Sequence, residues 1–197
     1  MTICGDRANA GAEGWAVWLT GLPASGKSTI ARQVVKILEQ REAAGMMGGV
    51  EVLESDALRE CLTPGAGYGE AERDLFYAAV AWMGVLLTRH GVNVVYDATA
   101  HRLRYREAAR QAIPRFVEVW VRCPVRVCRQ RDRKGIYAAA ERGEAEQVPG
   151  VGVEYEANER AEVIVDAERE SAEAAAGRIV QALEKRGWLD GVLGIKG

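Results

Sequence analysis

Five short apolar segments are spaced along the chain and predict the strands of a sheet. They occupy residues 15–20, 50–55, 92–97, 115–122 and 161–167, and each has the length of a buried strand. Between them lie segments with helical periodicity, at about 27–42, 70–89, 102–112 and 170–187. A further short helix is expected after Pro124. Strands that alternate with helices predict an α/β fold, with a parallel five-stranded sheet covered by helices on both faces.

The same pattern suggests how the domain is organised. We assign residues 15–190 to one domain, with 1–14 as a flexible lead-in and 191–197 as a C-terminal tail. Within the domain, residues 132–158 are charged, contain glycine and show little periodicity, so we expect them to form a mobile lid. Ligands of parallel sheets bind beyond the carboxyl ends of the strands, so catalytic and ligand-binding residues are expected at that edge.

Composition and charge exclude some classes of protein. The 197 residues carry a formal net charge of −2, which argues against a general nucleic-acid or anionic-membrane partner. The longest uncharged apolar stretch, FYAAVAWMGVLLT, is too short to span a bilayer. The N-terminal residues lack the basic start and apolar core of a signal peptide. A cytoplasmic location is therefore expected.

The residues that follow the first strand have the spacing of a phosphate-binding loop. Residues 21–28 read GLPASGKS and fit G-x-x-x-x-G-K-[ST], between a predicted strand and a predicted helix. In such loops the backbone N–H groups and the helix N-terminus attract phosphate, so ATP is the expected phosphoryl donor. Lys27 would reach the β- and γ-phosphates, and Ser28 would hold Mg²⁺. The expected ATP contacts in the loop are Gly21, Leu22, Pro23, Ala24, Ser25, Gly26, Lys27, Ser28 and Thr29.

Two carboxylates are expected at the same edge of the sheet. Asp56 follows the second strand and Asp97 ends the third. Asp56 could orient an acceptor hydroxyl, take its proton or bind the metal through water, whereas the plain alternative is that it caps the following helix. For Asp97 the same two alternatives stay open, and Thr99 is a candidate phosphate or metal contact. The nearby arginines suggest an anionic acceptor: Arg102, Arg104, Arg106 and Arg110.

Basic residues at the start of the expected lid are candidates for neutralising charge on the transferring phosphate. Arg131 and Lys134 lie in the segment QRDRKGIYAAAERGE, after the fourth strand. A solvated charged loop is the alternative. With Lys27 and Asp56, Arg131 completes the expected catalytic set.

Three stretches together resemble the adenylylsulfate (APS) kinase family: VWLTGLPASGKSTIAR, VEVWVRCPVRVCRQRDRKGIYAAAERGE and GVEYEANERAEVIVD. The resemblance covers about residues 15–187 and implies a P-loop kinase fold. It also implies transfer of the γ-phosphate of ATP to the 3′-hydroxyl of APS, and a homodimer. Asp56 matches a family aspartate, and Arg59 and Arg73 match arginines that contact APS. The full set of expected acceptor contacts is Asp56, Arg59, Tyr68, Arg73, Phe76, Asp97 and Val148.

The chain also departs from the family pattern around the acceptor. Phe76 stands where the family has a substrate-contacting asparagine, and Val148 where it has a phenylalanine that stacks on adenine. Ala138 and Ala139 replace two lysines. Moreover, SDALR and YDAT look more like polynucleotide-kinase-like and zeta-toxin-like kinases. Two alternatives therefore stay open: a P-loop kinase for another hydroxyl acceptor, and a nucleotide-binding regulatory module.

Overall fold

The structure is a computed structural model that describes residues 13–43, 49–65 and 67–189. Five parallel strands form one sheet in the order β2-β3-β1-β4-β5. This confirms the predicted fold class. The strands are β1 (Ala16–Thr20), β2 (Val50–Glu54), β3 (Asn93–Asp97), β4 (Phe116–Arg122) and β5 (Val163–Asp166).

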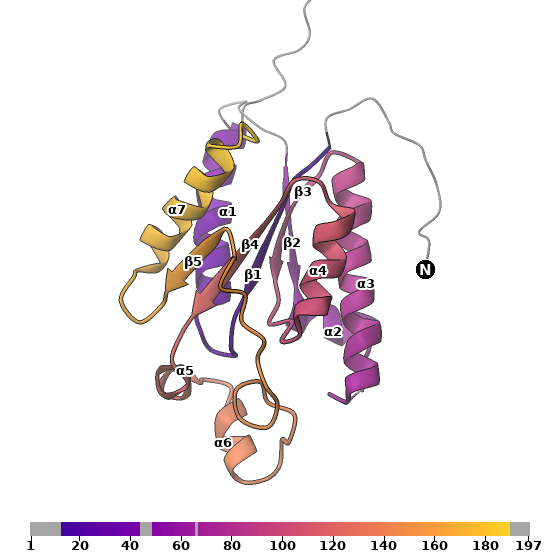
Figure 1. The fold of residues 1–197 in the computed structure, drawn as a ribbon, viewed down its shortest axis with the longest axis vertical. Coiled ribbons are helices and arrows are strands. Elements are labelled where there is room, and N and C mark those ends of the chain that lie inside the picture. The colour runs from indigo at the N-terminus through magenta and orange to yellow at the C-terminus, as the bar shows by residue number, and fades with distance from the viewer. Residues whose placement is uncertain (1–12, 44–48, 66, 190–197) are drawn as a thin grey trace, which may run out of the picture.

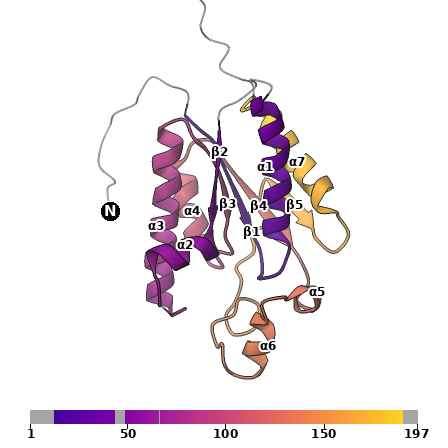
Figure 2. The same cartoon turned by 180° about the vertical axis from the view of Figure 1, so that it is seen from behind.

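Helices cover both faces of the sheet because successive strand residues point to opposite sides. In β1, Val17 and Leu19 belong to the core under α1 (Lys27–Ala43) and α7 (Ala172–Glu184). The alternate residue Trp18 belongs to the core under α3 (Glu70–Arg89) and α4 (Leu103–Ala112), where it stacks on Tyr96 with ring centroids 4.2 Å apart. Figures 1 and 2 show these two helical layers on either side of the strands.

Three short helices gather at the carboxyl ends of the strands. They are α2 (Ser55–Leu62), α5 (Val125–Arg131) and α6 (Ile136–Glu141), and Figure 1 shows α5 and α6 below the sheet. The expected second strand is one residue too long, because α2 begins at Ser55 and places Asp56 in its first turn. Within 132–158, where the sequence shows little periodicity, the structure has the helix α6, whose six residues are too few to show a helical period.

Some expected features lie outside the described residues. Most of the proposed lead-in, 1–12, and the whole proposed tail, 191–197, fall there. Within the described ranges, none of the helices combines the length and the apolar character needed to cross a bilayer.

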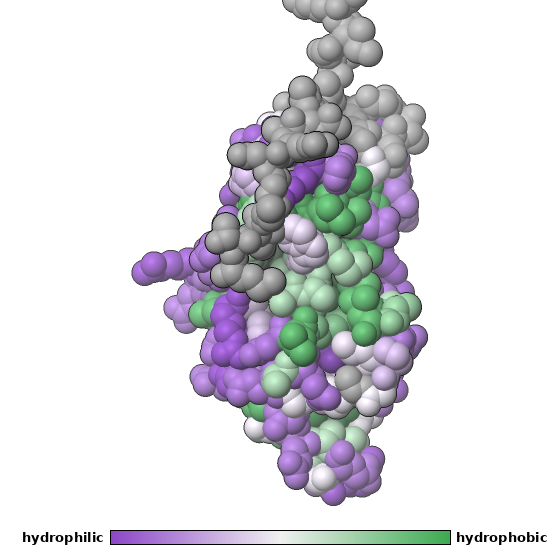
Figure 3. Space-filling view, turned by 90° about the vertical axis from the view of Figure 1, so that its right-hand side faces the viewer, coloured by the Kyte–Doolittle hydropathy of each residue, from purple (hydrophilic) through white to green (hydrophobic). Residues whose placement is uncertain are grey.

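Figure 3 shows apolar side chains gathered on the side of the molecule where α3 lies. Leu75, Trp82 and Leu86 of this helix are exposed to solvent.

Candidate functional site

The loop between β1 and α1 has the backbone shape that its glycines predict. Gly21 has φ +152°, and a Cβ there would lie 2.5 Å from the carbonyl oxygen of Val121, so only glycine fits. Gly26 has φ +103°, and α1 begins at the next residue. The loop therefore turns tightly into a helix N-terminus, where backbone N–H groups and the helix dipole favour a phosphate.

Lys27 lies beneath this loop with its charge directed at the carboxyl edge of the sheet. Its Nζ donates hydrogen bonds to the carbonyl oxygens of Gly21, at 3.2 Å, and Leu22, at 2.9 Å. The side chain is buried, and burial lowers the pKa of Lys27, while the nearby carboxylates of Asp97 and Asp56 raise it. A cation held between a phosphate-binding loop and two carboxylates is suited to contacting transferring phosphates.

The two carboxylates face one cavity but differ in exposure. Asp97 ends β3 and is buried, whereas the side chain of Asp56 is 62% exposed. Glu54 pairs with Asp97 in the parallel register, so the first turn of α2 lies beside the end of β3. Asp56 accepts a hydrogen bond from Lys134 Nζ at 2.5 Å, which connects the lid to this edge of the sheet. These carboxylates and the Ser28 hydroxyl are hard oxygen ligands of the type that Mg²⁺ prefers.

A cavity of about 700 Å³ lies between the sheet edge and the lid, within the size range of small-molecule sites. The expected site residues that line it are Pro23, Ala24, Lys27, Ser28, Asp56, Arg59, Tyr68, Arg73, Asp97, Thr99, Arg131, Lys134 and Val148. Those that do not line it are Gly21, Leu22, Ser25, Gly26, Thr29 and Phe76. For the loop residues this is compatible with phosphate contact through the backbone rather than through side chains.

Phe76 lies below the cavity rather than on its wall, which differs from the expected acceptor contact. Its side chain is 1% exposed, and the guanidinium carbon of Arg59 is 4.1 Å from its ring centroid. A cation over an aromatic face is stabilised by the ring quadrupole. Phe76 therefore supports Arg59, and Arg59 is the residue that reaches the cavity.

Arg59 and Arg73 have no carboxylate partner within the described residues. Arg59 lies over the rings of Phe76 and Tyr68, and Arg73 lies 5.6 Å from the Tyr68 ring centroid. Arg73 is buried, and its Nη2 donates to the carbonyl oxygen of Gln147 in the lid. Buried charges are normally paired, so the buried Arg73, with the partly exposed Arg59 in the same cavity, indicates a site for an anion.

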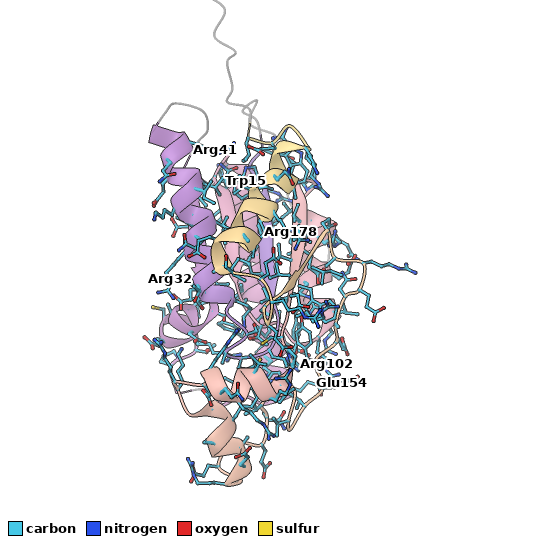
Figure 4. All side chains as sticks on the ribbon, turned by 90° about the vertical axis from the view of Figure 1, so that its left-hand side faces the viewer. Trp15, Arg32, Arg41, Arg102, Glu154 and Arg178 are labelled. Carbon is cyan, nitrogen blue, oxygen red and sulfur yellow. The ribbon has the colours of Figure 1, made fainter. Side chains whose placement is uncertain are left out.

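The arginines around α4 do not have the role expected from the sequence. They were expected to indicate an anionic acceptor, but each of them pairs with a carboxylate of this chain. Arg102, labelled in Figure 4, binds Glu156, and the fully buried Arg106 binds Glu118. The other two pairings are Arg104 with Glu70 and Asp74, and Arg110 with Glu162 and Glu118.

The segment expected to form the lid, residues 132–158, contacts the rest of the domain near both of its ends. At its start, the Tyr137 hydroxyl of α6 donates to the carbonyl oxygen of Pro23 in the phosphate loop, at 3.0 Å. At its end, Tyr155 and Thr20 share a hydrogen bond of 3.0 Å between their hydroxyls. Glu156 accepts a hydrogen bond from the backbone N–H of Leu103 at the start of α4. Tyr155 and Glu156 therefore connect the end of this segment to β1 and to the start of α4.

Sequence reasoning missed several residues of the cavity. His101, Tyr77, Glu144 and Gln147 line it, although none of them was among the expected site residues. Only the position of His101, four residues after the end of β3, could have suggested a place near the ligand edge.

Comparisons with known proteins agree on one family. The family model of adenylylsulphate kinase matches residues 13–166. A probable adenylyl-sulfate kinase of Pyrococcus abyssi is 37% identical over 177 residues, which cover 90% of this chain and 99% of that protein. A second, of Archaeoglobus fulgidus, is 38% identical over 153 residues, which cover 78% of this chain and 96% of that protein.

Solved structures give the same result. The Mycobacterium tuberculosis APS kinase in complex with AMPPNP and APS has a TM-score of 0.80 and 28% identity, covering 88% of this chain and 99% of that chain. A gluconokinase from Sinorhizobium meliloti has a TM-score of 0.53 and 21% identity, a likeness that concerns the fold alone.

Proposed function

This chain belongs to the adenylylsulfate kinase family, and we propose that it transfers the γ-phosphate of ATP to the 3′-hydroxyl of APS, forming 3′-phosphoadenylylsulfate (PAPS). The observation that carries this proposal is the pair of cavity arginines, Arg59 and Arg73, which have no carboxylate partner among the described residues and lie 4.8 Å and 5.6 Å from the centroid of the exposed Tyr68 ring. APS presents a planar base and an anionic phosphosulfate, which suit an aromatic face and guanidinium groups. An uncharged sugar alcohol would leave both cations unpaired.

The residues support a direct in-line transfer. In this proposal Lys27 contacts the β- and γ-phosphates of ATP, and Asp56 takes the proton of the 3′-hydroxyl as the new O–P bond forms and ADP leaves. Mg²⁺, when bound with ATP, would neutralise phosphate charge, with Ser28 as a ligand and Asp56 contacting it directly or through water. Arg131 and Lys134 would neutralise charge from the lid side.

In this scheme the contact between Lys134 and Asp56 favours an order of binding, in which ATP binds before the acceptor. Lys134 holds the carboxylate that is proposed as the base, and the Asp56 hydrogen bond raises the pKa of Lys134. Both side chains are largely exposed, so the pair contributes little to stability. The phosphates of ATP would compete for Lys134 and thereby release Asp56 for the acceptor.

The acceptor is tested by changing Arg59. We expect Arg59→Gln to raise KM for APS roughly 10- to 100-fold, since it removes a charged donor to the ligand, and to leave KM for ATP nearly unchanged. The measurement is PAPS formation, separated chromatographically. Arg104→Gln is the matched control, because Arg104 is half exposed and already pairs with Glu70 and Asp74.

Two results would contradict the proposal. If the parent makes no PAPS while a nucleoside, a short oligonucleotide or a sugar alcohol drives ADP release, the chain is a kinase for another hydroxyl acceptor. If no acceptor drives ADP release although ATP binds, the chain is a nucleotide-binding regulatory module.

Replacing Val148 with phenylalanine, the residue of the family pattern, is not a useful test of the acceptor site. Val148 is 5% exposed and packs in the core, where a larger ring would overpack.

The lid is expected to close on ligands. Between α6 and Glu154 the hydrogen bonds to the rest of the domain are few, and one of them, from Arg73 to the Gln147 carbonyl, ends in the cavity. We expect amide exchange in residues 138–153 to slow when an ATP analogue and APS are both bound. Exchange in α7, which is far from the cavity, is the internal control. Equal exchange with and without ligands would contradict a mobile lid and the roles of Arg131 and Lys134.

Two further predictions belong to this proposal. The homodimer that the family resemblance implies stays a prediction. A cytoplasmic location also stays a prediction. It fits ATP as donor and the small, charged acceptor, and no nucleic-acid or membrane partner is invoked.

A further inference from the structure

His101 is a cavity residue with no role in the scheme above. It lies in the loop after β3, and only 5% of it is exposed. Arg73 Nη1 lies 3.4 Å from its Nδ1 and 3.3 Å from its Nε2. On the other side, the ring meets the edge of Tyr105, with centroids 5.7 Å apart. The imidazole is therefore enclosed between α3 and α4 and faces the acceptor half of the cavity.

The backbone around His101 is held by three separate parts of the fold. Ala100 has φ +39°, a strained value for alanine. Its N–H donates to the Tyr77 hydroxyl at 3.0 Å, and its carbonyl oxygen accepts from Arg106. The carbonyl oxygen of His101 accepts from the backbone N–H of Glu156 at 2.8 Å. Such a strained turn persists only where its surroundings determine it, so the position of the imidazole is well defined.

The contact with Arg73 and the burial of His101 both favour an uncharged imidazole ring. A guanidinium has only donors, and Arg73 Nη1 is nearly equidistant from the two ring nitrogens, so in either neutral tautomer a nitrogen with a lone pair lies within its reach. Burial is the largest influence on His101 and lowers its pKa to about 4, with Arg73, Arg102 and Arg104 acting in the same direction and Glu156 against it. The other titratable groups packed nearby are Tyr77, Asp74 and Tyr105. At neutral pH the imidazole is uncharged and can accept a hydrogen bond from Arg73.

We propose that His101 is a positioning residue, which holds the Arg73 guanidinium between the end of β3 and the lid so that Arg73 can contact the acceptor. Arg73 has a second anchor, because its Nη2 donates to the Gln147 carbonyl of the lid. With His101 on one side and Gln147 on the other, the guanidinium plane is oriented before the acceptor binds. Orientation in advance reduces the entropy that is lost on binding. The acceptor effect rests on the proposed function, whereas the contact with Arg73 does not.

The kinetic test compares two replacements of His101. Leucine fills similar space without an acceptor atom, whereas glutamine keeps one. We expect His101→Leu to raise KM for APS roughly 10-fold, with kcat and KM for ATP changed less than about 3-fold, and His101→Gln to recover most of the loss. His90→Gln is the control, because His90 lies exposed at the end of α3. A His101→Leu variant with the parent KM for APS, or a glutamine variant no better than leucine, overturns the proposal.

A second measurement needs neither activity nor a His101 variant. The chain has two histidines, so the imidazole ¹⁵N signals of His90 and His101 are readily separated by NMR. We expect Arg73→Lys to shift the His101 signals and leave those of His90 unchanged. Unchanged His101 signals in Arg73→Lys overturn the proposal. If these signals shift but the parent makes no PAPS, the proposed function fails while the positioning role stands.

Discussion

Replacing Lys27 with alanine is expected to lower kcat for PAPS formation by several hundred-fold or more. A preorganised charge at the transferring phosphate contributes about 3–4 kcal/mol to transition-state stabilisation. The Lys27 ammonium is held for this purpose by the carbonyl oxygens of Gly21 and Leu22 and faces Asp97 and Asp56. Steady-state ADP release with ATP, Mg²⁺ and APS measures the effect.

The control for this variant lies on the same helix. Lys36 is exposed on α1, away from the cavity, so Lys36→Ala should retain the parent rate. Thermal unfolding of both variants distinguishes lost chemistry from lost folding, since Lys27→Ala also leaves buried Asp97 with less compensating charge. A loss of less than tenfold in a folded Lys27→Ala protein would remove the phosphate loop from the mechanism.

Asp56→Asn is expected to lower kcat at least ~100-fold with little change in ATP affinity. Asparagine keeps the size of aspartate but cannot take the proton of the acceptor hydroxyl, and general-base catalysis contributes about 10²–10⁴-fold. It also weakens the contact with Lys134, so the lid lysine loses its carboxylate partner. The rate constant and ATP binding, measured separately, show whether the loss lies in chemistry or in binding.

Asp97→Asn is the matched comparison, because both carboxylates face the same cavity. We expect a milder loss of kcat from this change, since Asp97 is buried at the end of β3, where its charge acts on that of Lys27, whereas Asp56 is the proposed base. If Asp97→Asn proves the more damaging variant, Asp56 is not the main base. The resemblance of YDAT to polynucleotide-kinase-like enzymes would then gain weight over APS as acceptor.

Local features of the sequence were sufficient for most of the fold and for the donor half of the site. The apolar segments predicted the five strands to within about two residues, because alternation and burial act on contiguous positions. The phosphate loop could be predicted from the sequence equally well. Its glycines are needed for a turn of eight neighbouring residues, and the positive φ at Gly21 and Gly26 depends on little beyond that turn and the strand beside it.

The arrangement of the acceptor half of the site depends on contacts between segments that are far apart in the sequence. Arg102 meets Glu156 across 54 residues, and Arg106 meets Glu118 across 12, so the sequence near α4 could not show that these arginines were already neutralised. Arg73 reaches Gln147 across 74 residues and His101 across 28.

What the sequence determined by itself was the order of strands and helices, the phosphate loop and the family. Only the tertiary structure decided that Phe76 lies beneath Arg59, that Lys134 pairs with Asp56 and that His101 faces Arg73. The physical reason is the distance along the chain between the residues that determine each feature. Backbone conformation and amphipathic periodicity are set by neighbours along the chain, whereas the partner of a charged side chain is set by whichever group the folded chain brings within a few ångströms.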